Sequence, residues 1–196
     1  MTIILASKSA ARRAVLDGAG VTYEATVAGV DEDAAKASLL AEGHGPRDIA
    51  DALAELKALR VSRAKGGFII GADQTLDLDG VLYDKAETVE TARERLILLR
   101  GKTHKLHSAV VVAKDGAAIW RELVTCTLTM RNFSDAFLDD YLATEGPHAL
   151  GSVGCYRLEG PGAQLFSKIE GDYFAILGLP LMGLLDLFRQ HGELPK

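Results

Sequence analysis

Residues 68–75 constrain the fold more than any other stretch, because an apolar run there ends abruptly in a carboxylate. The run consists of apolar and β-branched residues and is bounded by Gly66, Gly67 and Gly71. This pattern predicts a short buried strand that ends in Asp73. Ligands of open α/β sheets bind outside the carboxyl ends of the strands, so Asp73 is a candidate catalytic acid at the rim of the sheet. Asp is also a common turn residue, and capping of the following turn is the alternative.

Strands and helices alternate along the rest of the chain. Gly146 and Pro147 are expected to stop a helix after Glu145. Apolar runs with β-branched residues predict further strands at 2–5, 23–27 and 165–169. Helical spacing of apolar residues, together with capping residues, predicts helices at 10–19, 46–65, 88–99, 134–145 and 180–191.

Two segments of the sequence predict antiparallel hairpins. Asp79-Gly80 is typical of a tight hairpin turn. β-branched residues on both arms, 106–113 and 117–130, predict a second hairpin. The whole pattern therefore predicts an α/β fold, with a mixed, twisted sheet that carries antiparallel hairpins and is flanked by helices. The length favours a single domain over residues 1–196.

The charge and composition argue against several classes of protein. A net charge of -5 argues against a surface that binds nucleic acid through overall basicity. The chain shows neither the positive flank of a signal peptide nor 18 consecutive apolar residues, so we expect a cytoplasmic protein with no membrane partner. Cys126 and Cys155 lack CxxC spacing, which indicates neither a zinc site nor a disulfide framework. His104 and His107 would face opposite sides of a strand, which argues against a shared metal.

A small polar turn, Ser7-Lys8-Ser9, joins the first predicted strand to the first predicted helix. The N-terminus of a helix offers free N–H groups and a positive dipole, and Arg12 and Arg13 add further donors. This turn is therefore a candidate anion site, although the GxxxxGK[ST] phosphate loop is absent. The alternative is that the two arginines are merely solvated on an exposed helix face.

Acidic and basic residues also occur where functional roles are plausible. Asp31, Glu32 and Asp33 follow a predicted strand and could hold Mg²⁺ through their oxygens. Such a cluster more often simply starts the next helix. Lys57 falls on a stripe of small apolar residues in the helix at 46–65, where a functional role and snorkelling to solvent are equally plausible.

Several short motifs occur in the order and approximate spacing of one known family. They are Leu5-Ala6-Ser7-Lys8-Ser9 with Arg12-Arg13, Asp31-Glu32, Leu53-Ala54-Glu55-Leu56-Lys57-Ala58, Gly71-Ala72-Asp73-Gln74, Asp84-Lys85, Leu99-Arg100-Gly101-Lys102-Thr103-His104, Glu159-Gly160 and Gly178-Leu179-Pro180-Leu181. Over nearly its whole length the chain resembles the Maf family of nucleoside triphosphate pyrophosphatases, formerly described as septum-formation inhibitors. The resemblance implies the Maf/inosine triphosphate pyrophosphatase-like fold.

The resemblance assigns roles to the charged residues of these motifs. Ser7 and Arg12 would hold phosphate oxygens, and Lys57 and Lys85 would lie at the triphosphate. Asp73 matches the acid that the family uses as proton acceptor.

The resemblance also implies a divalent metal cofactor, most simply Mg²⁺, with Mn²⁺ as the alternative. Glu32 would be a metal ligand and Asp73 a second one. A carboxylate that binds a metal is a poor base, so the sequence leaves open whether Asp73 acts chiefly as ligand or base. A homodimer is implied by the resemblance alone.

Three positions bear on the choice of base. Gln74 and Glu159 resemble the branch of the family that acts on 7-methyl-GTP, whereas the dTTP/UTP branch carries Thr and Gln there. A carboxylate at Glu159 can accept hydrogen bonds from guanine N1–H and its 2-amino group, and it favours the positive charge of an N7-methylated ring. Ala11 departs from both branches, and the prolines of the family are Ala10 and Ala86 here.

The reaction implied is hydrolysis between the α and β phosphates of a nucleoside triphosphate, as house-cleaning of non-canonical nucleotides such as 7-methyl-GTP. Alternatives are a dTTP/UTP-type pyrophosphatase and a non-catalytic nucleotide-binding regulator of cell division. An RNA-binding module is disfavoured by the net charge and by the lack of an RNP-like aromatic pattern.

Overall fold

A mixed sheet forms the frame of the molecule in the computed structural model, which describes residues 2–195. Within those residues the sheet has seven strands in the order β2-β1-β3-β5-β6-β7, with β4 paired to β3. β1 runs parallel to β2 and β3, and every other pairing is antiparallel. The strands are β1 Ile3–Ala6, β2 Glu24–Thr26, β3 Phe68–Leu78, β4 Val81–Tyr83, β5 Thr103–Lys114, β6 Ala117–Met130 and β7 Phe166–Glu170. The predicted α/β fold with a mixed sheet is confirmed.

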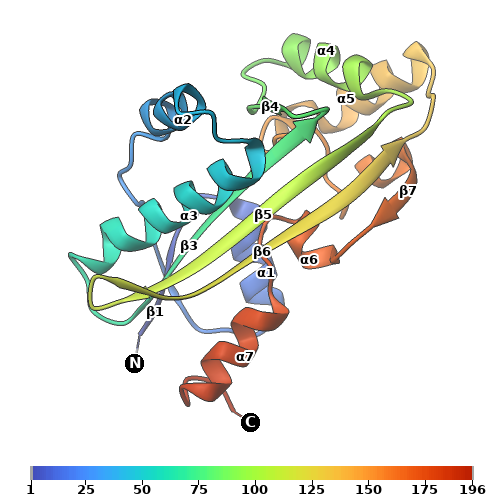
Figure 1. The fold of residues 1–196 in the computed structure, drawn as a ribbon. Helices are drawn as coiled ribbons and strands as arrows, with labels where there is room; N and C mark the ends of the chain where they lie inside the picture. The colour runs from blue at the N-terminus through green and yellow to red at the C-terminus, as the bar shows by residue number, and fades with distance from the viewer. Residues whose placement is uncertain (1, 196) are drawn as a thin grey trace.

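Helices cover both faces of this sheet and one of its ends (Figure 1). They are α1 Ala10–Gly18, α2 Glu32–Ala41, α3 Pro46–Ser62, α4 Val89–Leu99, α5 Asp135–Ala149, α6 Tyr173–Ile176 and α7 Met182–Gln190, with a 3-10 helix at Pro161–Leu165. α3 lies across one face through small residues such as Ala54, while α1 and α7 pack on the other face around Phe68. α4 and α5 lie side by side beyond the far end of β3. Among residues 2–195, no helix has the length and apolar character needed to cross a bilayer.

Both predicted hairpins are present. Asp79 and Gly80 turn β3 into β4 with φ values of 55° and 84°, and a tight hairpin turn of this kind needs a positive φ at both positions. β5 and β6 are paired along almost their whole length, with a bulge between Val112 and Ala113. The predicted hairpins are confirmed.

The prediction that the central strand ends at Asp73 is wrong. β3 continues to Leu78 because β5 pairs with it from Ile69 to Asp77 and β4 takes over its other edge from Leu76. On that other edge β1 pairs only as far as Ile70. Asp73 therefore lies in the middle of a strand, at a gap left by the end of β1.

Gly71 marks a close packing contact and no strand boundary. A Cβ there would overlap Ala54 O and would lie 2.8 Å from Ala58 Cβ, both on α3. The glycine lets the backbone of α3 approach β3 directly. One turn of α3 is thereby held above the part of β3 that carries Asp73.

The prediction that Gly146 and Pro147 end a helix is also wrong, since α5 continues to Ala149. Proline inside a helix lacks the N–H donor and is normally unfavourable. Here the residues on either side of the exposed Pro147 and His148 are buried: Ala149 is fully enclosed in the core, and Gly146 packs closely against Val89 at the start of α4. Tertiary packing outweighs the local signal.

Candidate active site

A cleft of about 1270 Å³ opens beside the end of β1. Its walls come from the β1–α1 turn, the segment leading into α2, α3, the middle of β3, the segment after β4 and the loop after α5. Nine positions to which the family resemblance gives a role in the site line this one cleft: Ser7, Ala11, Arg12, Glu32, Lys57, Asp73, Gln74, Lys85 and Glu159. Arg13, expected as a further donor beside Arg12, is not among the lining residues.

Lys57 joins two carboxylates in the cleft. Its Nζ lies 2.6 Å from Asp73 Oδ1 and 2.8 Å from Glu32 Oε2. Only 5% of Lys57 is exposed, so the alternative that it snorkels to solvent is wrong. The close contact of α3 at Gly71 explains why the lysine reaches Asp73, which is itself buried.

The acidic segment before α2 plays two local roles. Asp31 caps α2, because its Oδ1 accepts a hydrogen bond from Ala34 N at 3.0 Å. Glu32 then occupies the first turn of the helix and is aimed at Lys57. The segment does start a helix, as the alternative interpretation held, and it also delivers a carboxylate to the cleft.

The turn after β1 presents its donors to the same cleft. Ser9 caps α1, and Ser7 Oγ accepts hydrogen bonds from Ser9 N and Arg12 Nη1, each at 3.2 Å. Arg12 Nε donates to Gly178 O at 2.8 Å. Burial lowers the pKa of Arg12, and the carboxylates of Asp73 and Glu32 oppose this shift. Arg12 is therefore oriented inside the cleft.

Lys85 lines the cleft from the segment after β4. Desolvation, and then the positive charge of Arg12, lowers the pKa of Lys85. Asp73 and Glu32 act in the opposite direction on the same group. Three basic and two acidic side chains of the cleft therefore interact electrostatically with one another. Such a mixture of charges would favour the binding of a polyanion together with a cation.

Gln74 is held by its amide nitrogen. Nε2 donates to Ser108 Oγ at 2.8 Å and to the carbonyl oxygens of Ala175 and Ile176, each at 3.0 Å. Those carbonyls belong to α6, which Asp172 caps through a bond from Ala175 N. With the nitrogen occupied in this way, the amide presents Oε1 as its hydrogen-bond acceptor.

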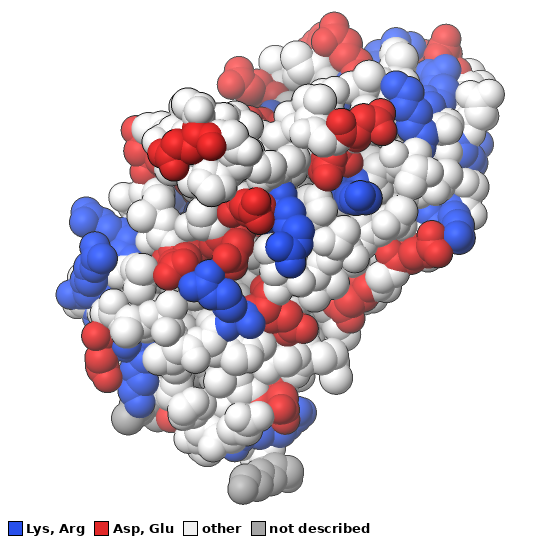
Figure 2. Space-filling model, viewed as in Figure 1, with Lys and Arg blue, Asp and Glu red and all other residues white. Residues whose placement is uncertain are grey.

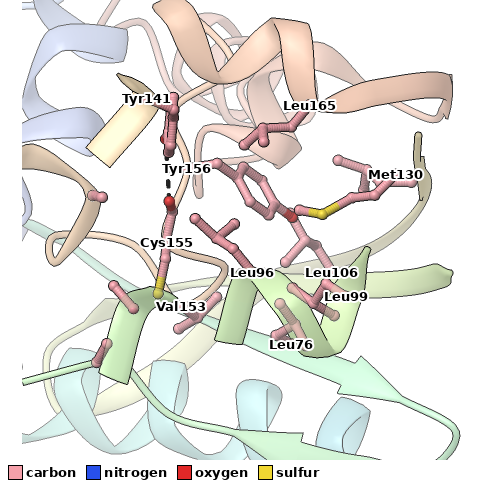
Figure 3. Packing of buried hydrophobic residues seen from close by; sticks show 14 of the residues in the cluster. Leu76, Leu96, Leu99, Leu106, Met130, Tyr141, Val153, Cys155, Tyr156 and Leu165 are labelled. Carbon is pink, nitrogen blue, oxygen red and sulfur yellow. Dashed lines mark hydrogen bonds between the residues drawn. The ribbon is translucent and has the colours of Figure 1, made fainter. Parts of the chain in front are cut away.

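Glu159 lies exposed on a loop at residues 150–160, in which the Ser152 hydroxyl bonds both backbone polar groups of Tyr156. Behind it, Arg157 donates two bonds of 2.8 Å to the buried Glu145 on α5. The hydrogen bond with Glu145 is the main cause that raises the pKa of Arg157, and Glu159 adds to it. Figure 3 shows Tyr141 pointing at Cys155, where its hydroxyl donates to the carbonyl oxygen at 3.1 Å.

On the face drawn in Figure 2, Lys and Arg side chains are interspersed with Asp and Glu. This face carries no continuous basic surface. A polyanion would depend on the local cations of the cleft.

The sequence matches the family described as Maf-like protein over residues 2–191. The chain belongs to the Maf family. A Caulobacter vibrioides protein named nucleoside triphosphate pyrophosphatase is 62% identical over 192 residues, covering 98% of this chain and 96% of that protein. A protein of the same name from Granulibacter bethesdensis is 53% identical over 195 residues, with 99% of each chain covered. A Brucella abortus protein named 7-methyl-GTP pyrophosphatase is 46% identical over 189 residues, covering 96% and 95%.

The acids of this Maf cleft fit a divalent cation that is shared with a ligand. Among residues 2–195, no group of three or more His, Cys, Asp or Glu side chains is arranged to hold a metal. Glu32 and Asp73 nevertheless face each other across Lys57. Mg²⁺ is commonly bound by one or two carboxylates plus phosphate oxygens and water, so two acids suit it better than a closed cage would.

Lys36 lines the Maf cleft and was missed from the sequence. Its Nζ lies 2.5 Å from Asp84 Oδ1 and 3.1 Å from Asp33 Oδ1. A signal was available, because Lys36 follows Glu32 by four residues and therefore shares its face of α2. The pairing with Asp84 connects α2 to the segment that carries Lys85.

Proposed function

We propose that this Maf protein hydrolyses the bond between the α and β phosphates of a nucleoside triphosphate, and that 7-methyl-GTP is its preferred substrate. The products would be the nucleoside monophosphate and pyrophosphate. The observation that carries the proposal is Lys57, held between Glu32 and Asp73 in a cleft that Arg12 and Lys85 also line. The names of the relatives support the same activity.

The charged part of the cleft, called the phosphate end from here on, would position the triphosphate. It comprises Ser7, Arg12, Glu32, Lys57, Asp73 and Lys85. Catalysis of phosphoryl transfer depends mainly on positioning and on neutralising charge on the phosphate oxygens. Three cations concentrated in one cleft can do this in a protein whose net charge is -5.

Asp73 would take the proton from the attacking water. Its carboxylate is kept in place by Lys57, which donates to Oδ1 at 2.6 Å, and a fixed carboxylate in the cleft suits a general base. Glu32 would hold a divalent cation, Mg²⁺ or Mn²⁺, together with phosphate oxygens. A role for Asp73 as a second metal ligand is the alternative to its role as the base, because one carboxylate cannot fully do both. When bound, that cation supplies charge neutralisation at the phosphates.

The remaining part of the cleft, called the base end, comprises Ala11, Gln74 and Glu159. Gln74 Oε1 and the Glu159 carboxylate are both hydrogen-bond acceptors. Guanine offers donors at N1 and its 2-amino group, and its N7-methylated form adds a positive charge that a carboxylate favours. This match supports 7-methyl-GTP over UTP or dTTP, whose bases carry a single N–H between two carbonyls.

The proposal is tested by incubating the purified protein with Mg²⁺ and a panel of 7-methyl-GTP, GTP, dTTP, UTP and CTP, and measuring pyrophosphate release. We expect release from 7-methyl-GTP at the highest kcat/KM. No pyrophosphate from any nucleotide would favour the rival function, a non-catalytic nucleotide-binding regulator of cell division. A preference for dTTP or UTP would retain the activity and overturn the substrate.

We extend the proposal to a homodimer located in the cytoplasm. Family resemblance supports the dimer. Sedimentation of the purified protein tests it, and a single species at the mass of one chain would contradict it.

A further inference from the structure

Arg95 lies on α4, outside the set of residues that line the cleft, yet it contacts two of the cleft's walls. Its Nη1 donates to Asp84 O at 2.8 Å and to Val153 O at 3.0 Å. Its guanidinium also lies over the Tyr83 ring, 4.6 Å from the centroid. A single nitrogen thus joins two segments that are far apart in the sequence.

Each of these segments carries one end of the proposed substrate site. Asp84 directly precedes Lys85 of the phosphate end, and its own side chain binds Lys36 on α2. Val153 belongs to the loop that carries Glu159 of the base end, and only 8% of it is exposed. Because Arg95 bonds to both segments, its position affects the distance between the phosphate end and the base end.

The loop side of this connection is the more firmly anchored. Val153, Cys155 and Tyr156 are buried in one core cluster with Leu96 of α4 (Figure 3). Leu96 directly follows Arg95 in the sequence. The other side follows β4, a strand of three residues paired only to β3 among the described residues, and reaches the same cluster only through Ala86 and the partly buried Tyr83. A contact from α4 would thus fix the less constrained segment relative to the more constrained one.

We propose that Arg95 is a positioning residue that fixes the spacing between the phosphate end and the base end of the cleft. This inference rests on the proposed function, because the two ends are defined by a nucleoside triphosphate. A ligand that spans both ends gains affinity only if they are held at the right separation. A ligand that occupies one end alone is insensitive to that separation.

Arg95→Gln tests the proposal, with Arg93→Gln as the matched control. Arg93 lies on the same helix and pairs with the exposed Asp139 at 2.9 Å, away from the cleft. Binding is measured by calorimetry with tripolyphosphate and with the α,β-methylene analogue of 7-methyl-GTP. We expect Arg95→Gln to weaken the nucleotide analogue about tenfold, the scale of one lost hydrogen bond from a charged donor, and to change tripolyphosphate binding less than about twofold. Arg93→Gln should change neither.

If Arg95→Gln bound both tripolyphosphate and the nucleotide analogue more weakly by the same factor, Arg95 would act directly on the phosphate end. If the affinity for both were unchanged, Arg95 would have a structural role only. Either result overturns the proposal. Arg95→Lys keeps the charge with a shorter reach and should give an intermediate loss, and it replaces Arg95→Gln should that variant fail to fold.

Hydrogen exchange of the unliganded protein separates this inference from the proposed function. Arg95→Gln should speed exchange in residues 83–87 more than in the better anchored residues 151–159, whereas Arg93→Gln should leave both unchanged. Unchanged exchange in residues 83–87 would contradict the coupling, whatever nucleotide the protein hydrolyses.

Discussion

The two ends of the cleft are built from different interactions. At the phosphate end, charged side chains from separate elements meet directly, as Lys57 meets Glu32 and Asp73. At the base end, Gln74 is fixed by backbone carbonyls of α6, and Glu159 projects from a loop anchored behind by Arg157 and Glu145. On the proposed function, affinity for phosphates would therefore depend on charge, while the choice of base would depend on the direction of a few acceptors. Changes at the first end should affect all nucleotides alike.

The largest effect is expected for Asp73→Asn. The amide keeps the size of the side chain and removes the proton acceptor, so turnover should fall at least about 100-fold for every nucleotide, the lower range for general-base catalysis. Binding of the α,β-methylene analogue should persist, because Lys57 still pairs with Glu32. Steady-state kinetics and calorimetry measure the two quantities.

Asp77→Asn is the matched control for that variant. Asp77 lies on the same strand but pairs with His107 at 3.0 Å, and neither residue lines the cleft. It should retain turnover. If Asp73→Asn instead lost binding while keeping its fold, Asp73 would be chiefly a metal ligand.

Lys57→Met is expected to have the next largest effect. It removes one of the cations proposed to bind phosphate and leaves Glu32 and Asp73 as neighbouring negative charges. We expect KM for every nucleotide to rise by about 10- to 100-fold, the range for a lost hydrogen bond to a charged group. Arg60→Met, an exposed position on the same helix, should leave KM unchanged. A rise confined to one nucleotide would contradict the division between the two ends.

Glu159→Gln should have a smaller and more selective effect. It replaces one acceptor by a neutral amide, so the ratio of kcat/KM for 7-methyl-GTP to that for UTP should fall about tenfold. Inhibition by tripolyphosphate should not change. Glu170→Gln, an exposed carboxylate on β7, is the control. Equal losses for both nucleotides would mean that Glu159 acts at the phosphates.

The same contrast explains what the sequence could predict. Ser7 follows the end of β1 and Glu32 starts α2, and such local patterns led to both residues. Asp73 was singled out by the same kind of pattern, although the strand end predicted there is absent from the structure. The alternation of strands and helices likewise gave the fold class and both hairpins. Which charges pair with each other was beyond these patterns, since Lys57 meets Asp73 only because Gly71 lets α3 approach β3.

The errors have the same physical origin. β3 continues past Asp73 because strands distant in the sequence pair with it, and α5 passes through Pro147 because Gly146 and Ala149 on either side are buried by tertiary packing. Arg95 carries no local signature at all, because its acceptors are backbone carbonyls 11 and 58 positions away. A sequence pattern shows the chemistry of the side chains and the spacing of apolar residues. Long-range contacts with backbone atoms change neither, so they cannot be predicted from such a pattern.

Replacement of His104 is expected to have the smallest effect on activity at neutral pH. Protonation of His104 at low pH should loosen the base end by a separate route. The residue lies on β5, is 1% exposed, and its Nε2 is 2.6 Å from the hydroxyl of Tyr156 in the loop that carries Glu159. Burial lowers the pKa of His104 from 6.5 to about 4. Between these values the unfolded chain binds more protons than the folded one. The free energy of unfolding should therefore be unaffected by this group above pH 6.5 and should fall as the pH drops toward 4, by about 3 kcal/mol in total.

Urea unfolding at pH 7.5, 5.5 and 4.5 measures this dependence. In His104→Phe the fall between pH 6.5 and 4 should become shallower, even though loss of the bond to Tyr156 lowers stability at pH 7.5. His44→Asn, at an exposed histidine, should keep the slope of the unmodified protein. Because Tyr156 belongs to the loop of Glu159, acid should also reduce the preference for 7-methyl-GTP before it weakens tripolyphosphate binding. Parallel loss of both would mean that the two ends of the cleft unfold as one unit.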